Sequence, residues 1–244
     1  MPVNNVPKGR QRVHRDNRFF ISADLAQVND YTAITVTERV MLRTTEDTGR
    51  LGYMGTPITK TVESTDELHL RHIERPERGT SYPRIVERLK ELCDSPQLKG
   101  KTRTVVIDIT GVGRPVWDLL KKARIGVPLK GITITGGNTV TKDGDIYSVP
   151  KRDLISSLQV AFQNGQIKIP LGLPEADALV RELTNFKVKI NLNGHDQYES
   201  WREGIHDDIV LSAAMGVWLA SRTGFNLEAL IDNDALYRPS YWRR

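Results

Sequence analysis

Two apolar runs in the sequence predict buried strands, and an acid ends each of them. Residues 105–107 are Val-Val-Ile, whose β-branched side chains are typical of a strand buried on both faces, and Asp108 follows. Residues 19–23 form the second run, which ends at Asp24. Residues 32–37 then alternate between apolar and polar side chains, which predicts a strand that pairs back on the first. The pattern thus places two carboxylates at the ends of buried strands.

The residues after Asp108 predict a tight turn and then a helix. Gly111 and Gly113 suit the turn, Pro115 suits a first helical turn, and residues 116–120 begin an apolar helix face. An α/β sheet presents an acid at its carboxyl edge by this succession of strand, acid, turn and helix. A simpler interpretation is that Asp108 only caps the following turn.

The remaining pattern predicts a three-strand meander followed by alternating helices and strands. We expect further strands at 68–73, 129–135 and 167–169, and helices around 85–92, 154–162, 175–186 and 206–218. We also expect a long hairpin excursion at 43–66, a polar loop at 136–149, and a hairpin of 187–192 with 197–201 around Asn193-Gly194. The last helix is apolar almost all round, so it should be buried.

The composition is that of a soluble globular protein and excludes several classes. The chain has 244 residues, 39% of them hydrophobic and 27% charged, and is long enough for one large domain or two small ones. No apolar run approaches the roughly 20 residues that cross a membrane, and the polar amino terminus lacks a signal core. We therefore expect an intracellular protein. Cys93 is the only cysteine, which excludes an internal disulfide and a zinc cluster.

Positive charge is concentrated at the amino terminus. The formal net charge is +5, and the first eighteen residues carry +4 of it, from five basic residues against Asp16. Two interpretations fit: a flexible arm that contacts phosphate, or a solvated linker. We expect residues 1–18 to form this arm, 19–221 a single domain and 222–244 a tail.

Three separated acidic positions are expected to meet. If the strands that end at Asp24 and Asp108 are neighbours, a strand spacing of roughly 5 Å brings their carboxylates within reach of one cation. Asp207 and Asp208 add carboxylates at the start of the buried last helix. Acids at a helix start are commonly only caps and dipole partners. Together, however, these oxygen ligands suit a hard divalent cation.

Four segments in this order and spacing resemble a known family. They are Phe20-Ile-Ser-Ala-Asp-Leu-Ala-Gln27, Asp108-Ile-Thr-Gly-Val-Gly-Arg-Pro115, Val149-Pro-Lys-Arg-Asp-Leu-Ile155 and Gly204-Ile-His-Asp-Asp-Ile-Val210. The set resembles the ribonuclease H-like nuclease domain of the large terminase subunit of tailed phages, which cuts concatemeric viral DNA during genome packaging. The resemblance implies an α/β fold: a mixed sheet of five or more strands, flanked by helices, with acids on the first and fourth strands.

The resemblance also implies an endonuclease that uses two Mg²⁺ or Mn²⁺ ions. Asp24 and Asp108 match the first two catalytic acids of the family, and the third falls on Asp207 or Asp208, of which we prefer Asp208. The candidate auxiliary residues are His206, which would orient water or a ligand, and Lys151 and Arg152, which would contact phosphate. Each of these three has a plain alternative as a structural or solvated side chain.

One feature of the family is missing from the sequence. A G-x-x-x-x-G-K-[ST] phosphate loop is absent, so we expect a nuclease without the ATPase motor. The implied partners are double-stranded DNA, an ATPase motor, a small terminase subunit and a portal protein, in the cytoplasm of an infected bacterium, with no membrane. Two alternatives stay open: a nuclease resembling Holliday-junction resolvases, and a non-catalytic DNA-binding packaging module of the same fold.

Overall fold

The computed structural model describes residues 9, 11–26, 31–111, 113–192 and 207–224. In chain order the elements are β1 (Gln11–Asp24), β2 (Ala33–Leu51), the short 3-10 helix η1 (Tyr53–Gly55), β3 (Pro57–Glu74), α1 (Tyr82–Asp94), β4 (Arg103–Asp108), α2 (Gly113–Ala123), β5 (Leu129–Thr135), β6 (Thr141–Asp143), β7 (Ile146–Pro150), α3 (Lys151–Gln163), β8 (Ile167–Lys168), α4 (Ala176–Leu192) and α5 (Asp208–Arg222). They confirm the predicted α/β class.

The strands form one mixed sheet in the order β6-β7-β5-β4-β1-β2-β3-β8. β1 pairs in parallel with β4, β4 with β5, and β5 with β7, whereas β6 and β7 are antiparallel. The first and fourth strands are therefore neighbours, and they are the two strands that end in Asp24 and Asp108. This placement agrees with the sheet that the resemblance implies.

The chain divides into two compact units. One contains Met1–Asn17, Val40–Glu67 and Gly224–Arg244, and the other contains Arg18–Arg39 and Leu68–Thr223. The arm, single domain and tail at 1–18, 19–221 and 222–244 stay a prediction. Of the predicted arm, Gln11–Arg18 belong to β1, because strand pairing with β2 holds even a polar segment extended. In the first unit, for example, His14 Nε2 lies 3.1 Å from Thr45 Oγ1.

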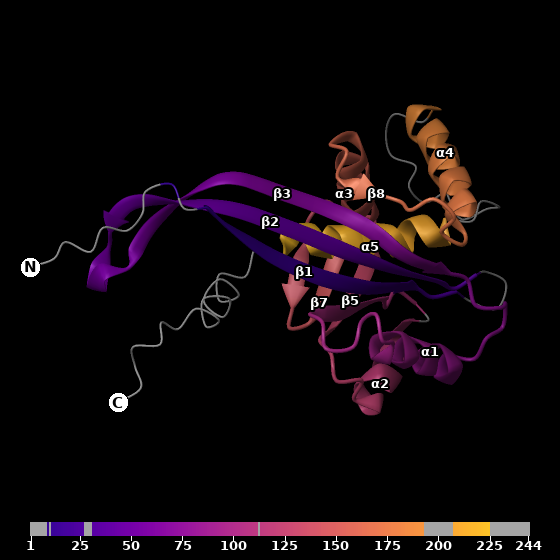
Figure 1. Ribbon diagram of the computed structural model, residues 1–244. Helices are drawn as coiled ribbons and strands as arrows, with labels where there is room; N and C mark the ends of the chain where they lie inside the picture. Colours follow the sequence, from indigo (N-terminus) through magenta and orange to yellow (C-terminus); the bar gives the residue numbers. More distant parts are fainter. Residues whose placement is uncertain (1–8, 10, 27–30, 112, 193–206, 225–244) are drawn as a thin grey trace, which may run out of the picture. The chain divides into compact units, whose positions relative to one another are not determined.

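Alternation along the strands of the second unit builds two hydrophobic cores, one on each face of the sheet. On β1, Phe19 and Ile21 pack with α1 and α2, whereas Phe20 packs with α3 and α5. On β4, Val105 and Ile107 pack in the core with α1 and α2, and Val106 packs in the core with α3 and α5. Figure 1 shows α1 and α2 together on one side of the strands and α3 on the other. Successive strand side chains point to opposite faces, so even-numbered residues of these two strands share one face.

The helices bury the faces that their spacing predicted. In α1, which follows Ser81 and has a proline in its first turn, the buried residues are Ile85, Val86, Leu89, Leu92 and Cys93. In α5, the buried stretch is continuous from Asp208 to Ala220, which confirms the prediction of a helix buried all round. No helix in the described part of the chain is long and apolar enough to span a membrane.

Two predicted segments, one strand of a hairpin and one loop, are wrong. Residues 187–192 continue α4 instead of forming a strand, and the hairpin's remaining residues 193–201 lie outside the described residues. Leu183, Phe186 and Ile190 also recur at helical spacing, so the sequence pattern is compatible with a strand or with a helix. Extending an existing helix by one residue costs less than starting a new element, so α4 continues. The predicted loop 136–149 contains β6 and most of β7, which pair through the turn at Gly144.

Candidate active site

The carboxyl edge of the parallel strands brings the first two predicted acids together. Ala23 of β1 is in register with Ile107 of β4, and the next residue of each strand is the acid, Asp24 or Asp108. Both acids are buried. As even-numbered residues they lie on the face of the sheet that packs against α3 and α5.

A tight turn fixes the side chain of Asp108. The backbone N–H of Thr110 donates to Asp108 Oδ1 at 2.8 Å, and the Thr110 hydroxyl accepts the N–H of Ile134 at 2.8 Å. Gly113 begins α2 so close to the strand end that a Cβ there would lie 1.9 Å from the carbonyl oxygen of Asp108. Only glycine fits this return, as the glycine-rich sequence predicted.

The third acid comes from α5, which lies against β1 through small residues. The Ser212 hydroxyl donates to the carbonyl oxygen of Ser22 at 3.0 Å. Ser22 is two residues before Asp24, and Ser212 is four residues after Asp208. Because residues two apart share a strand face and residues four apart share a helix face, this contact places Asp208 on the side of α5 that faces the end of β1. Asp208 is buried.

These carboxyl groups act on one another electrostatically. Burial raises the pKa of Asp24 well above its usual value, and the negative charges of Asp108, Asp208 and Asp207 raise it further, while Lys151 lowers it. Burial also raises the pKa of Asp108, against hydrogen bonds from Thr110 and Asp24 that lower it. Burial and the neighbouring acids thus disfavour the ionised form of Asp24, and burial disfavours that of Asp108.

Lys151 supplies positive charge at this edge. It is the first residue of α3, and its Nζ lies 2.8 Å from Asp207 Oδ2. Asp207 is the N-cap residue of α5, yet its side chain makes no cap hydrogen bond. The pairing of Asp207 with Lys151 gives it a role different from that of the buried Asp208.

The donor set fits a hard divalent cation. Asp24, Asp108 and Asp208 are acids that burial and mutual repulsion make costly as anions, and a bound cation would offset that cost. Within the described residues, however, no three His, Cys, Asp or Glu side chains already stand arranged as ligands of one ion. Asp207 pairs with Lys151, and a hydrogen bond from Asp24 lowers the pKa of Asp108.

The other two auxiliary candidates have different outcomes. Arg152 lies beside Lys151, but its guanidinium is partly exposed and donates to the Asn138 carbonyl oxygen at 3.1 Å and to Asp153 Oδ1 at 3.4 Å. His206 lies outside the described residues, so its role stays a prediction.

Glu182 was not among the predicted site residues, but it is a buried acid on which the charge of Asp207 acts. Burial raises the pKa of Glu182 to about 7; the Val210 amide and Arg75 lower it, and Asp207 raises it. One sequence signal marks it: Glu182 interrupts the apolar spacing of Ala178 and Leu179 on α4, where a charged residue would otherwise be costly.

Comparisons with known proteins give weak likenesses. No protein-family model and no curated protein matches the chain. Among solved structures it is similar to the human cytomegalovirus terminase nuclease domain soaked with manganese, at 10% identity over 89% of this chain and 87% of that one, with a TM-score of 0.46. It is also similar to NurA bound to dAMP and manganese, at 11% identity over 96% and 57% of the two chains, with a TM-score of 0.14. Both likenesses are too weak to assign residues, so the site depends on the chain's own geometry.

Proposed function

We propose that this protein is a metal-dependent DNA endonuclease of the terminase nuclease type, with a ribonuclease H-like sheet, that cuts concatemeric viral DNA during genome packaging. The observation that carries the proposal is the electrostatic coupling of Asp24 to Asp108, Asp207 and Asp208 at one edge of the sheet. Strongly shifted carboxyl groups gathered from separate elements are typical of catalytic sites.

Asp24, Asp108 and Asp208 would hold the divalent cations, Mg²⁺ or Mn²⁺. When bound, two such ions supply a more acidic attacking water and neutralise the charge of the leaving oxygen in phosphodiester hydrolysis. The chain's own contribution is rigidity: Thr110 fixes Asp108, and Ser212 fixes the face of α5 that presents Asp208.

Lys151 is the described cation best placed to contact the scissile phosphate. In the metal-free chain it pairs with Asp207, and it lowers the pKa of both Asp24 and Asp108. When cations are bound by the acids, the ammonium group of Lys151 would be able to contact a phosphate oxygen. Arg152, beside it at the exposed start of α3, would contact the DNA backbone farther along.

Plasmid cleavage tests the proposal. Supercoiled plasmid should be nicked or linearised with Mn²⁺ or Mg²⁺ and stay intact with a chelator. Asp24→Asn, Asp108→Asn and Asp208→Asn should each lower the rate by roughly 10²-fold or more, because a lost ligand removes several kcal/mol of transition-state stabilisation. Asp145→Asn is the charge-matched control, since Asp145 precedes β7 at the opposite edge of the parallel strands.

The outcome also separates the alternatives. Cleavage that persists with the chelator, or in Asp24→Asn, contradicts the proposed site. A four-way junction cut in preference to linear duplex would favour the resolvase-like nuclease. DNA binding without any cleavage would favour the non-catalytic module.

The biological setting belongs to the same proposal. Double-stranded DNA would be the substrate, and the ATPase motor, small subunit and portal protein would be partners in the cytoplasm of an infected bacterium. The acids Asp24, Asp108, Asp207 and Asp208 and the basic Lys151 all belong to one of the two units.

A further inference from the structure

Glu182 lies in an environment that is unfavourable for a carboxylate. Its side chain is 6% exposed and shares the buried face of α4 with Ala178 and Leu179. Burying a charge in such a place is costly unless hydrogen bonds and an opposite charge offset the lost solvation. The contacts of this side chain therefore indicate what it does.

The side chain of Glu182 contacts the start of another helix. Its Oε2 accepts the backbone N–H groups of Ile209 and Val210, each at 3.1 Å. These belong to the first turn of α5, whose N–H groups have no partner within the helix. Asp207, the N-cap residue, makes no side-chain cap hydrogen bond. Glu182 thus caps α5 from a different helix.

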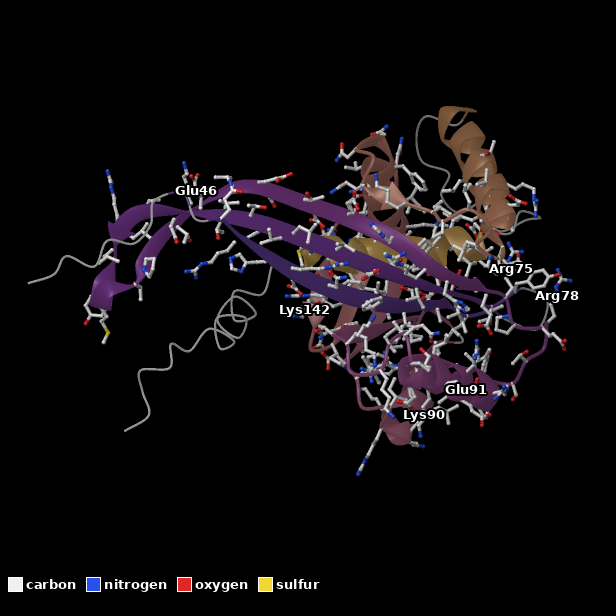
Figure 2. The ribbon with its side chains drawn as sticks, viewed as in Figure 1. Glu46, Arg75, Arg78, Lys90, Glu91 and Lys142 are labelled. Atoms are coloured by element: carbon white, nitrogen blue, oxygen red, sulfur yellow. The ribbon has the colours of Figure 1, made fainter. Side chains whose placement is uncertain are left out.

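Arg75 holds the other oxygen of Glu182. Its Nη2 donates to Glu182 Oε1, and its Nε lies 3.8 Å from Glu175 Oε2. Arg75 and Arg78 follow the end of β3, where both guanidinium groups lie over the ring of Tyr31 (Figure 2). The Glu182 carboxylate is therefore fixed between the guanidinium group of Arg75 and the first-turn amides of α5.

The turn that Glu182 holds is the turn that carries the acids of the candidate site. Asp207 and Asp208 directly precede Ile209 and Val210. We propose that Glu182 is a positioning residue, which fixes the first turn of α5 so that Asp208 is presented to a divalent cation beside Asp24. The link to a cation rests on the proposed function, whereas the fixing of the turn stands on the hydrogen bonds alone.

Two conservative variants distinguish the length of the Glu182 side chain from its negative charge. In Glu182→Gln the amide oxygen can still accept both N–H groups, so the cap survives, whereas the amide NH₂ replaces the oxygen that Arg75 Nη2 donates to and the ion pair is lost with the charge. Glu182→Asp keeps the charge but is one methylene shorter, which withdraws it from the amides. Positioning predicts that Gln stays close to wild type and Asp does not. A purely electrostatic role predicts the reverse order.

Hydrogen exchange reads the turn directly and needs no metal or substrate. In the full-length, metal-free chain, the amides of Ile209 and Val210 should exchange faster in Glu182→Asp than in wild type and remain protected in Glu182→Gln. Leu179→Ala is the matched control, since it removes a buried side chain from the same helix without touching these hydrogen bonds. Equal protection of both amides in wild type and Glu182→Asp overturns the proposal.

Binding of Mn²⁺ alone, measured by electron paramagnetic resonance without DNA, tests the link to the cation. Glu182→Asp should bind Mn²⁺ about tenfold or more weakly, which is the usual effect of disturbing a group that orients a metal ligand. Leu179→Ala should bind like wild type. A loss of affinity as large in Leu179→Ala would show general destabilisation and overturn the cation link. A wild type that binds no Mn²⁺ would refute the nuclease proposal and the cation link, whereas unchanged exchange at Ile209 and Val210 would refute the role of Glu182.

Discussion

At the scale of single residues, the buried acids of the candidate site lower the stability of the folded chain. Asp24 is buried, and its neighbours Asp108, Asp208 and Asp207 all disfavour its ionised form. A raised pKa in the folded chain means that the free energy of unfolding falls as pH rises from the ordinary value of Asp towards the raised one. The metal-free protein therefore carries a cost at neutral pH that a neutral side chain would not have.

Asp24→Asn should stabilise the metal-free protein. Because the amide removes a buried group whose charged form is disfavoured by burial and by the other acids, we expect the free energy of unfolding at pH 7 to rise by roughly 0.5–2 kcal/mol, the usual size of a single stabilising substitution. Urea denaturation with a chelator measures this. With Mn²⁺ the order should reverse, since a cation stabilises only the chain that binds it. A variant less stable than wild type with the chelator would contradict the assigned repulsion.

At the scale of elements, α5 is held at both ends and along its face. Glu182 accepts the amides of its first turn, and Arg39 donates from β2 to the carbonyl oxygen of Ala220 at 2.5 Å and to that of Thr223. A carboxylate at the N-terminus and a guanidinium at the C-terminus both complement the helix dipole. Along the face, Ser212 lets the helix approach β1 closely.

Gly216→Ala should destabilise the protein by about 1–3 kcal/mol, less the roughly 1 kcal/mol that alanine gains in a helix. A Cβ at Gly216 would lie 2.7 Å from Ser22 Oγ and 3.2 Å from Thr37 Oγ1, so α5 would have to move off the sheet. Thermal denaturation measures the change, with the exposed Ser221→Ala on the same helix as the control for helix propensity. A raised melting temperature in Gly216→Ala would mean that the helix does not approach β1 this closely.

At the scale of the whole molecule, ion pairs tie the helices to the sheet. Arg88 of α1 donates to both oxygens of Glu74 at the end of β3, at 2.9 and 3.0 Å, and His72 Nε2 lies 2.9 Å from the same carboxylate. The hydrogen bonds with His72 and Arg88 lower the pKa of Glu74 to about 2. An acid with a lowered pKa contributes stability above its unfolded value that is lost as pH falls.

Glu74→Gln should flatten the acid limb of the stability profile. Wild type loses the contribution of Glu74 between about pH 4.5 and 2, whereas the amide has no proton to gain in that range. Urea denaturation at a series of pH values measures the slope, and Glu77→Gln, an exposed change of the same charge after β3, is the control. Parallel acid limbs for wild type and Glu74→Gln would remove the basis for this assignment.

The sequence by itself determined the elements that carry the acids. Apolar runs that end in Asp24 and Asp108, glycines that allow the return at Gly113, and a last helix apolar all round are local patterns, and burial selects for them directly. These patterns gave the α/β class, whereas the pairing of the two acid-bearing strands was only a condition until the sheet order showed it. Residues 187–192 fit both the strand period and the helix period, so the local pattern could not decide between a strand and a helix.

Only the tertiary structure decided which side chains meet. The pairing of Lys151 with Asp207 joins residues 56 apart in sequence, and the cap that Glu182 provides joins residues 27 and 28 apart. Such contacts follow from how helices pack on the sheet, and no local periodicity encodes them. The sequence shows only that Glu182 interrupts an apolar helix face, whereas its partners, the first-turn amides of α5 and Arg75, meet it only once the chain has folded.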